Sequence, residues 1–137
     1  MRKAKYVTLA LTVLLFGCAV RNNPNLTKQT TVELNLTDQI TQAQQDYESF
    51  FINVGRSKAQ GLLTDEDTRL LIKLGYPVKA SLEEAASLWK AYQSAPSNAV
   101  LTKVLSLVSK AATDYAMIYA TRANQIKTNA ERKAVSQ

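Results

Sequence analysis

The sequence predicts an all-α fold: a small antiparallel helical bundle of about four helices that follows a flexible tether. After Asp38, apolar residues recur at intervals of three and four along most of the chain, which is the period of one face of a helix. Capping residues, glycines and prolines divide this pattern into four segments. The connections are short, which favours antiparallel neighbours. The segment lengths follow the order long, short, short, long.

The first predicted helix covers residues 38–59. Its apolar face is formed by Ile40, Ala43, Tyr47, Phe50 and Val54. Thr37 is a suitable N-cap, and Gly61 supplies a stop. The preceding residues 18–36 are mostly polar and include Pro24, so they are predicted to be the lipidated cysteine and its tether.

The second helix is expected to start at a capping box formed by Thr64 and Asp67. The stretch RLLIKLGYP is typical of a helix end, because Gly75 suits the left-handed position after the last turn and Pro77 disfavours continuation.

Ser81 and Glu84 form a second capping-box pattern, which predicts a third helix that ends before Pro96. The fourth helix is predicted over residues 98–127, and the polar residues 128–137 are expected to fray. The helical bundle is therefore predicted to comprise residues 37–127.

The N-terminal segment has the anatomy of an export signal. Arg2, Lys3 and Lys5 precede an uncharged run of eleven residues, Tyr6–Phe16. A membrane-spanning helix needs about 20 apolar residues, so this run is too short to cross a bilayer as a helix. Residues 1–17 are predicted to be removed from the mature protein.

The end of this segment, Leu15-Phe16-Gly17-Cys18, resembles the lipobox of bacterial lipoproteins, although Phe16 is larger than the residue that the family prefers. The resemblance implies that signal peptidase recognises Leu15, Phe16 and Gly17 and cleaves before Cys18. It also implies that the Cys18 sulfur carries diacylglycerol and that the freed amine takes a further acyl chain such as palmitate. Two or more acyl chains hold a protein stably on a membrane.

Ala19 follows the cysteine, where the resemblance would place an aspartate for retention at the inner membrane. We therefore expect the periplasmic side of the outer membrane in a Gram-negative cell, and the outer face of the plasma membrane in a Gram-positive one. Two alternatives remain open: cleavage after Ala19, which releases a soluble protein, and retention of the segment as an anchor.

Composition narrows the chemistry. The chain has no histidine and one cysteine, which removes the commonest general base and leaves no Cys/His zinc site. The net charge of +6 falls to +3 once Arg2, Lys3 and Lys5 are removed, so basicity gives no argument for nucleic acid. We expect no enzyme activity, no cofactor and no metal.

Two groups of acidic residues are candidates for a metal or catalytic site. The triplet Asp65-Glu66-Asp67 lacks the glycine and glutamate that an EF-hand loop requires, since Leu70 and Tyr76 stand there. Favourable charge at a helix N-terminus explains it better. Adjacent Glu83 and Glu84 point in different directions on a helix, which disfavours an acid/base pair.

An interaction surface is the remaining candidate site. Its predicted residues are Trp89, Lys110, Tyr115, Tyr119 and Arg122. Aromatic residues anchor many interfaces, and the C-terminal third is basic. The alternative interpretation is that the aromatic residues, with Tyr47, are ordinary core and the charges a solvated face.

The sequence therefore favours a lipid-anchored envelope protein without enzymatic activity, which presents a helical bundle to an envelope protein partner or supports a membrane surface. One alternative is a phage- or plasmid-derived accessory lipoprotein that acts in exclusion or lysis. Another is a weak hydrolase that uses carboxylates, which the lack of histidine disfavours.

Overall fold

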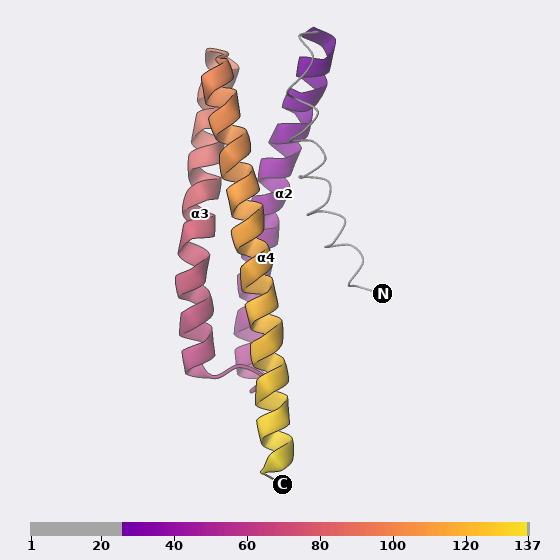
Figure 1. Cartoon of the computed structure of the whole chain (residues 1–137), viewed down its shortest axis with the longest axis vertical. Helices are drawn as coiled ribbons and strands as arrows, with labels where there is room; N and C mark the ends of the chain where they lie inside the picture. The colour runs from indigo at the N-terminus through magenta and orange to yellow at the C-terminus, as the bar shows by residue number, and fades with distance from the viewer. Residues whose placement is uncertain (1–25, 137) are drawn as a thin grey trace.

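The computed structural model describes residues 26–136, which form three α-helices and no strand. These are α2 (Leu26–Ala59), α3 (Asp65–Ser94) and α4 (Asn98–Val135). The chain runs along α2, returns along α3 and reverses again along α4, so neighbouring helices are antiparallel (Figure 1). The all-α prediction is confirmed. The predicted four helices are not, because the described residues form three.

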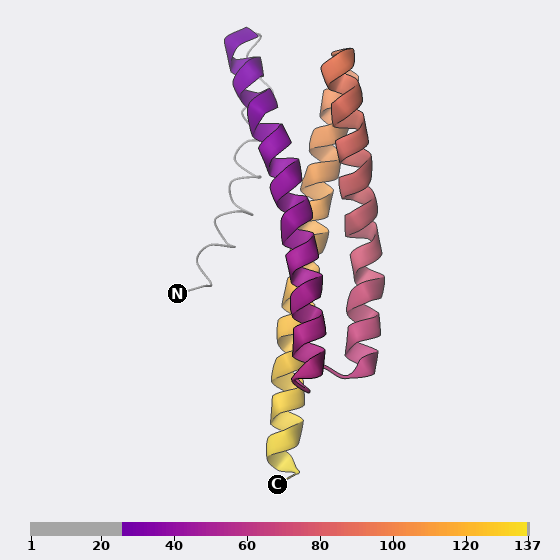
Figure 2. The ribbon, with the colours of Figure 1, turned by 180° about the vertical axis from the view of Figure 1, so that it is seen from behind.

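The three helices are not equally associated. α3 and α4 lie side by side along most of α3 and make the most extensive contact in the bundle. α2 packs on this pair, and its N-terminal end diverges from both partners in the two opposite views (Figures 1 and 2). The C-terminal end of α4 extends past the turn that joins α2 to α3 (Figure 1).

The predicted helix end at Gly75 is wrong, because α3 continues through Gly75 and Pro77 to Ser94. Gly75 does not adopt a positive φ angle, which an end of that type requires. Pro77 removes one backbone hydrogen bond, but its ring lies on the exposed side of α3. On the opposite side, Leu71, Val78 and Leu82 are buried in one core cluster, and this continuous packing outweighs the local cost.

The predicted capping box at Ser81 and Glu84 is wrong for the same reason. Ser81 lies inside α3 and is 7% exposed. The Glu84 carboxylate instead forms a salt bridge with the Lys103 ammonium of α4, with Oε1 and Nζ 2.6 Å apart. The predicted third helix is thus the second half of α3.

The outer helices are longer than predicted. α2 begins at Leu26, so residues 26–36 are helical rather than tether, and Thr37 lies inside the helix. The Thr37 hydroxyl accepts a hydrogen bond from Trp89 Nε1 at 2.9 Å, and buried Leu36 belongs to the core. Residues 18–25 of the predicted tether lie outside the described residues.

α4 continues to Val135, so most of the predicted frayed tail is helical. The added turns have partners at the α2–α3 turn: Asn129 Nδ2 donates to the Leu62 carbonyl at 3.0 Å, and Lys133 Nζ donates to the Gly61 carbonyl at 2.6 Å. These contacts order a segment that is polar in sequence.

The predicted helix end and turn around residue 61 are confirmed. α2 ends at Ala59, and Gly61 has a φ angle of 66°, which favours glycine. Thr64 caps α3 as predicted: its hydroxyl accepts from the Asp67 amide at 3.1 Å, and its own amide donates to Asp67 Oδ2 at 2.9 Å. α3 also ends just before Pro96, as expected.

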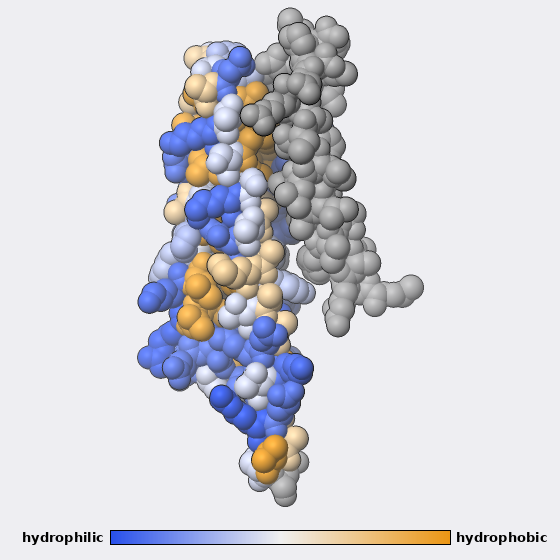
Figure 3. Space-filling model, viewed as in Figure 1, coloured by the Kyte–Doolittle hydropathy of each residue, from blue (hydrophilic) through white to orange (hydrophobic). Residues whose placement is uncertain are grey.

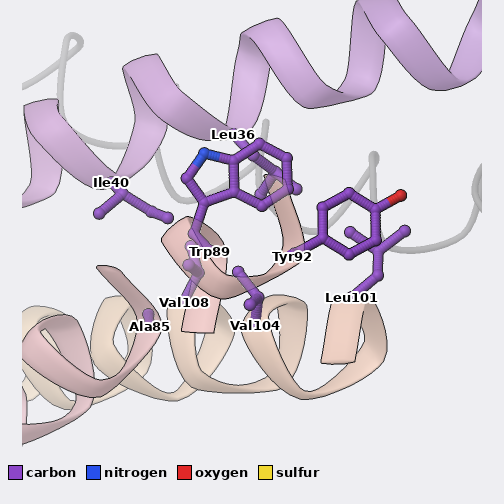
Figure 4. Close-up of a cluster of buried hydrophobic side chains, with 8 residues drawn as sticks. All are labelled: Leu36, Ile40, Ala85, Trp89, Tyr92, Leu101, Val104 and Val108. Carbon is purple, nitrogen blue, oxygen red and sulfur yellow. The ribbon is translucent and has the colours of Figure 1, made fainter. Parts of the chain in front are cut away.

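The core has two clusters along the bundle. The upper cluster surrounds Trp89 and Tyr92, whose rings stack with centroids 5.2 Å apart. Leu36 and Ile40 reach it from α2, and Val104 comes from α4 (Figure 4). The lower cluster contains Phe50, Val54, Leu63, Leu71, Val78, Leu82, Ala111 and Ile118.

Candidate interaction surface

A chain of aromatic rings crosses from α2 to α4 beside the lower cluster. We call it the aromatic belt, and it comprises Tyr47, Phe50, Phe51, Tyr115 and Tyr119. Phe50 is its centre, with ring centroids 5.1 Å from Phe51, 5.7 Å from Tyr115 and 6.2 Å from Tyr119. Tilted and edge-on pairs at such distances stabilise each other beyond their burial. The belt holds Tyr119 from inside, although that residue is 38% exposed.

Tyr119 emerges on a side of α4 that has little charge. Of the exposed residues between Asn98 and Asn124, only Lys103 and Lys110 are charged. We call the uncharged exposed residues from position 102 to 123 the uncharged face of α4; it comprises Thr102, Ser106, Ser109, Thr113, Ala116, Met117, Tyr119, Ala120 and Ala123. Figure 3 shows white and pale orange side chains along much of this helix, with separate blue ones between them and the densest blue toward the lower end.

Both cations at the edge of this face have partners. Lys103 Nζ lies 2.6 Å from Glu84 of α3, and Lys110 Nζ lies 2.6 Å from Asp114 one turn along α4. They lie seven residues apart, so they mark the same side of the helix. Their charges are therefore directed away from the uncharged face.

The threonine hydroxyls on or near this face are turned back on their own helix. Thr102 donates to the Asn98 carbonyl at 2.9 Å, and Thr113 donates to the Ser109 carbonyl at 3.1 Å. Because these donors are satisfied within α4, the two hydroxyls need no partner from outside the helix. Covering this face with another apolar surface would leave few polar groups without partners.

The exposed side of α3 carries more charge than the α4 face, although it also exposes Leu70, Ile72 and Tyr76. Glu66, Arg69 and Lys73 surround a shallow depression that also includes Leu70, and further charges follow at Lys79, Glu83 and Lys90. Charged residues are depleted at the centres of protein interfaces, so α3 is the poorer candidate surface.

The five predicted interaction residues do not form one surface. Tyr115 and Tyr119 lie together in the aromatic belt, whereas Trp89 is 5% exposed in the upper core cluster. Lys110 is paired with Asp114 at the edge of the uncharged face. Tyr47 lies with these aromatic residues, as its helical spacing predicts, whereas no pattern in the sequence singles out Met117, which is 53% exposed.

Arg122 is directed toward α2 rather than outward. Its Nη2 donates to Ser57 Oγ at 2.7 Å, and Ser57 is buried. Arg122 Nε and Gln125 Oε1 are also buried, and neither has a hydrogen-bond partner among the described residues. This junction between α2 and α4 is therefore polar and incompletely satisfied.

The acidic triplet at the start of α3 is explained by contacts within the chain. Hydrogen bonding and charge from Lys58, whose Nζ lies 2.9 Å away, lower the pKa of Asp65. Partial burial raises the pKa of Asp67, but hydrogen bonds from Asn129 and Thr64 outweigh it and lower the pKa overall.

On α2, burial raises the pKa of Tyr47, and Tyr76 and Glu83 add to this effect.

Residues 26–136 contain no group of three or more metal-ligating side chains that could hold an ion. None of the three described helices has a stretch sufficiently long and apolar to span a bilayer. The lipobox residues Leu15, Phe16, Gly17 and Cys18 lie outside the described residues.

Comparison with protein-family models, with curated proteins and with solved structures gave no match for this chain.

Proposed function

We propose that this protein is a lipid-anchored component of the cell envelope that acts by binding another protein rather than by catalysis. The anchor is Cys18, through the lipobox-like sequence Leu15-Phe16-Gly17-Cys18. The binding surface is the uncharged face of α4, with Met117 and Tyr119 as its large apolar contacts.

The observation that carries the proposal is the lack of charge on an exposed face that runs along residues 102–123 of α4. Solvated helix faces normally carry charged residues, as α3 does here. The small side chains of Ala116 and Ala120 would allow a partner helix to approach α4 closely, while Tyr119, supported by Phe50, would supply an apolar anchor.

The anchor is tested by mass spectrometry of the mature protein. We expect an N-terminal Cys18 that carries acyl chains, and Cys18→Ser should abolish both the modification and membrane retention. An N-terminal Val20, or an unmodified thiol in the mature chain, would exclude the lipoprotein assignment.

The binding surface is tested by photo-crosslinking in native membranes, with the photoreactive residue at Met117 or, as a control, at Lys90 of α3. We expect a defined crosslinked protein from position 117 alone. Ala120→Arg should abolish that product because it places a charge on the uncharged face, whereas Ala80→Arg, at an exposed alanine of α3, should leave it unchanged. Equal crosslinking from both positions would contradict this surface.

A further inference from the structure

α2 is attached to the bundle differently from the other two helices. The contact between α3 and α4 is the most extensive, that between α2 and α3 is smaller, and that between α2 and α4 is the smallest. α2 also diverges from both partners toward its N-terminal end (Figures 1 and 2). Elements with fewer buried contacts open at lower free energy than the rest of a protein.

Three hydrogen bonds among the described residues join α2 to the other two helices, in addition to its apolar contacts. Trp89 Nε1 donates to Thr37 Oγ1 at 2.9 Å, Tyr115 Oη donates to the Asp46 carbonyl at 3.3 Å, and Arg122 donates to Ser57. Water replaces such bonds when the groups separate, so their net contribution is modest. The buried apolar side chains of α2, which include Leu36, Ile40, Phe50 and Val54, also lose their burial on separation, but α3 and α4 contribute more members to the two core clusters.

One position holds α2 against α3 by shape alone. A Cβ atom at Gly75 would overlap the Phe51 ring and lie 3.2 Å from the Tyr47 hydroxyl. The glycine thus provides the space in which the α2 part of the aromatic belt is seated. Gly75 faces α2, so a substitution there alters the contact between α2 and α3 without changing a residue that faces α4.

We propose that α2 is a releasable strap: it opens from the α3–α4 hairpin as a unit while the hairpin stays folded, and this uncovers the apolar surface around Trp89 and Tyr115. The proposal does not depend on the uncharged face of α4, which is exposed whether α2 is seated or released.

The test is native-state hydrogen exchange of the full mature chain, measured amide by amide over a range of low denaturant concentrations. We expect the slowest amides of α2 to exchange about a hundredfold faster than the slowest amides of α3 and α4. A single common rate for the slowest amides of all three helices would overturn the proposal.

Variants separate release of α2 from general loss of stability. Gly75→Ala raises the free energy of the seated state from which every opening starts, so it should accelerate the slowest amides of all three helices by a common factor of about thirty and leave the gap between α2 and the hairpin unchanged. Asp67→Asn should instead accelerate only the slowest amides of α3 and α4, by a few-fold, because its contacts with Thr64 and Asn129 persist when α2 is released. Gly55→Ala is the matched control for Gly75→Ala, because a Cβ there meets nothing within 4 Å. It should not accelerate exchange in any helix.

Thr37→Val provides a milder second variant, since it removes only the acceptor for Trp89 Nε1. It should accelerate exchange in α2 by a few-fold and shift the fluorescence of Trp89, the only tryptophan in the chain. Equal acceleration in all three helices by Asp67→Asn would contradict the strap, and the wild-type measurement decides the matter if a variant does not fold.

Discussion

The α3–α4 seam and the seat of α2 both bury apolar side chains, but they differ in what accompanies them. Val104, Ala111 and Ile118 of α4 face buried aliphatic residues of α3 over most of the length of that helix. α2 contributes Leu36, Ile40 and the aromatic belt, together with hydrogen bonds to Trp89, Tyr115 and Arg122. The first interface is continuous and apolar, with Trp89 and Tyr92 of α3 among its aliphatic side chains; the second consists of separate apolar contacts joined by polar ones.

This difference teaches how three helices of similar composition acquire different roles. Aliphatic burial grows with contact length, so the two helices that run side by side dominate stability. Polar contacts fix the register of α2 while contributing less net free energy per contact.

Truncation in the seam should cost more than truncation in α2. Ile118→Ala should lower the free energy of unfolding by about 4 kcal/mol, because Ile118 is fully buried, whereas Ile40→Ala at the diverging end of α2 should cost about 2 kcal/mol. Urea unfolding followed by circular dichroism measures both. Equal losses would remove the distinction between the two interfaces.

Gly75→Ala should destabilise the protein by about 2 kcal/mol, although alanine favours helices, because its Cβ would overlap the Phe51 ring. Gly55→Ala should instead stabilise by about 0.5–1 kcal/mol through helix propensity. Thermal unfolding gives both values. Adding Phe51→Ala to Gly75→Ala should recover part of the loss, and strict additivity of the two substitutions would exclude the clash.

Asp67→Asn should cost about 1 kcal/mol at pH 7, as loss of a capping carboxylate does. Because the folded-state pKa of Asp67 is lowered, its contribution is fully present above the unfolded-state pKa and is lost as pH falls through the folded-state pKa. The stability difference between wild type and Asp67→Asn should therefore narrow below about pH 4. Denaturant unfolding between pH 7 and pH 3 measures it; a difference that widens on acidification would be incompatible with this assignment.

Lys110→Ala should change the free energy of unfolding by less than about 0.5 kcal/mol, since the Lys110–Asp114 pair lies on the surface. Added salt should reduce even this difference. The same substitution provides a control for partner binding, because Lys110 lies at the edge of the uncharged face. A larger stability change would mean that the α4 surface contributes to the fold.

The sequence predicted those helix starts and ends that depend on residues close by in the chain. Thr64 and Asp67 form the expected capping box, and Gly61 has the expected positive φ angle. Ser81 and Glu84 carry the same pattern in the interior of α3, where no helix begins. The capping-box pattern therefore predicts a helix start only where the packing of the helix on its neighbours is also interrupted.

For the candidate surface, the sequence identified Tyr47, Tyr115 and Tyr119 by their helical spacing, and the structure brings these residues into one belt. It could not separate them from Trp89, because burial depends on which helices cover each face. The uncharged face of α4 is visible in the sequence as missing charges, but only the packing of α2 and α3 determines that this side is left exposed.

By itself, the sequence determined that the described chain is helical and where α3 and α4 begin, because caps and stops act within about four residues. The export signal and the lipobox resemblance are likewise local patterns. Only the tertiary structure decided that α3 continues through Gly75 and Pro77 and that α2 and α4 extend beyond their periodic segments. The physical reason is that a helix continues past a local penalty when distant residues, such as Phe51 at Gly75 or the α2–α3 turn at Asn129, offset it with contacts that no short stretch contains.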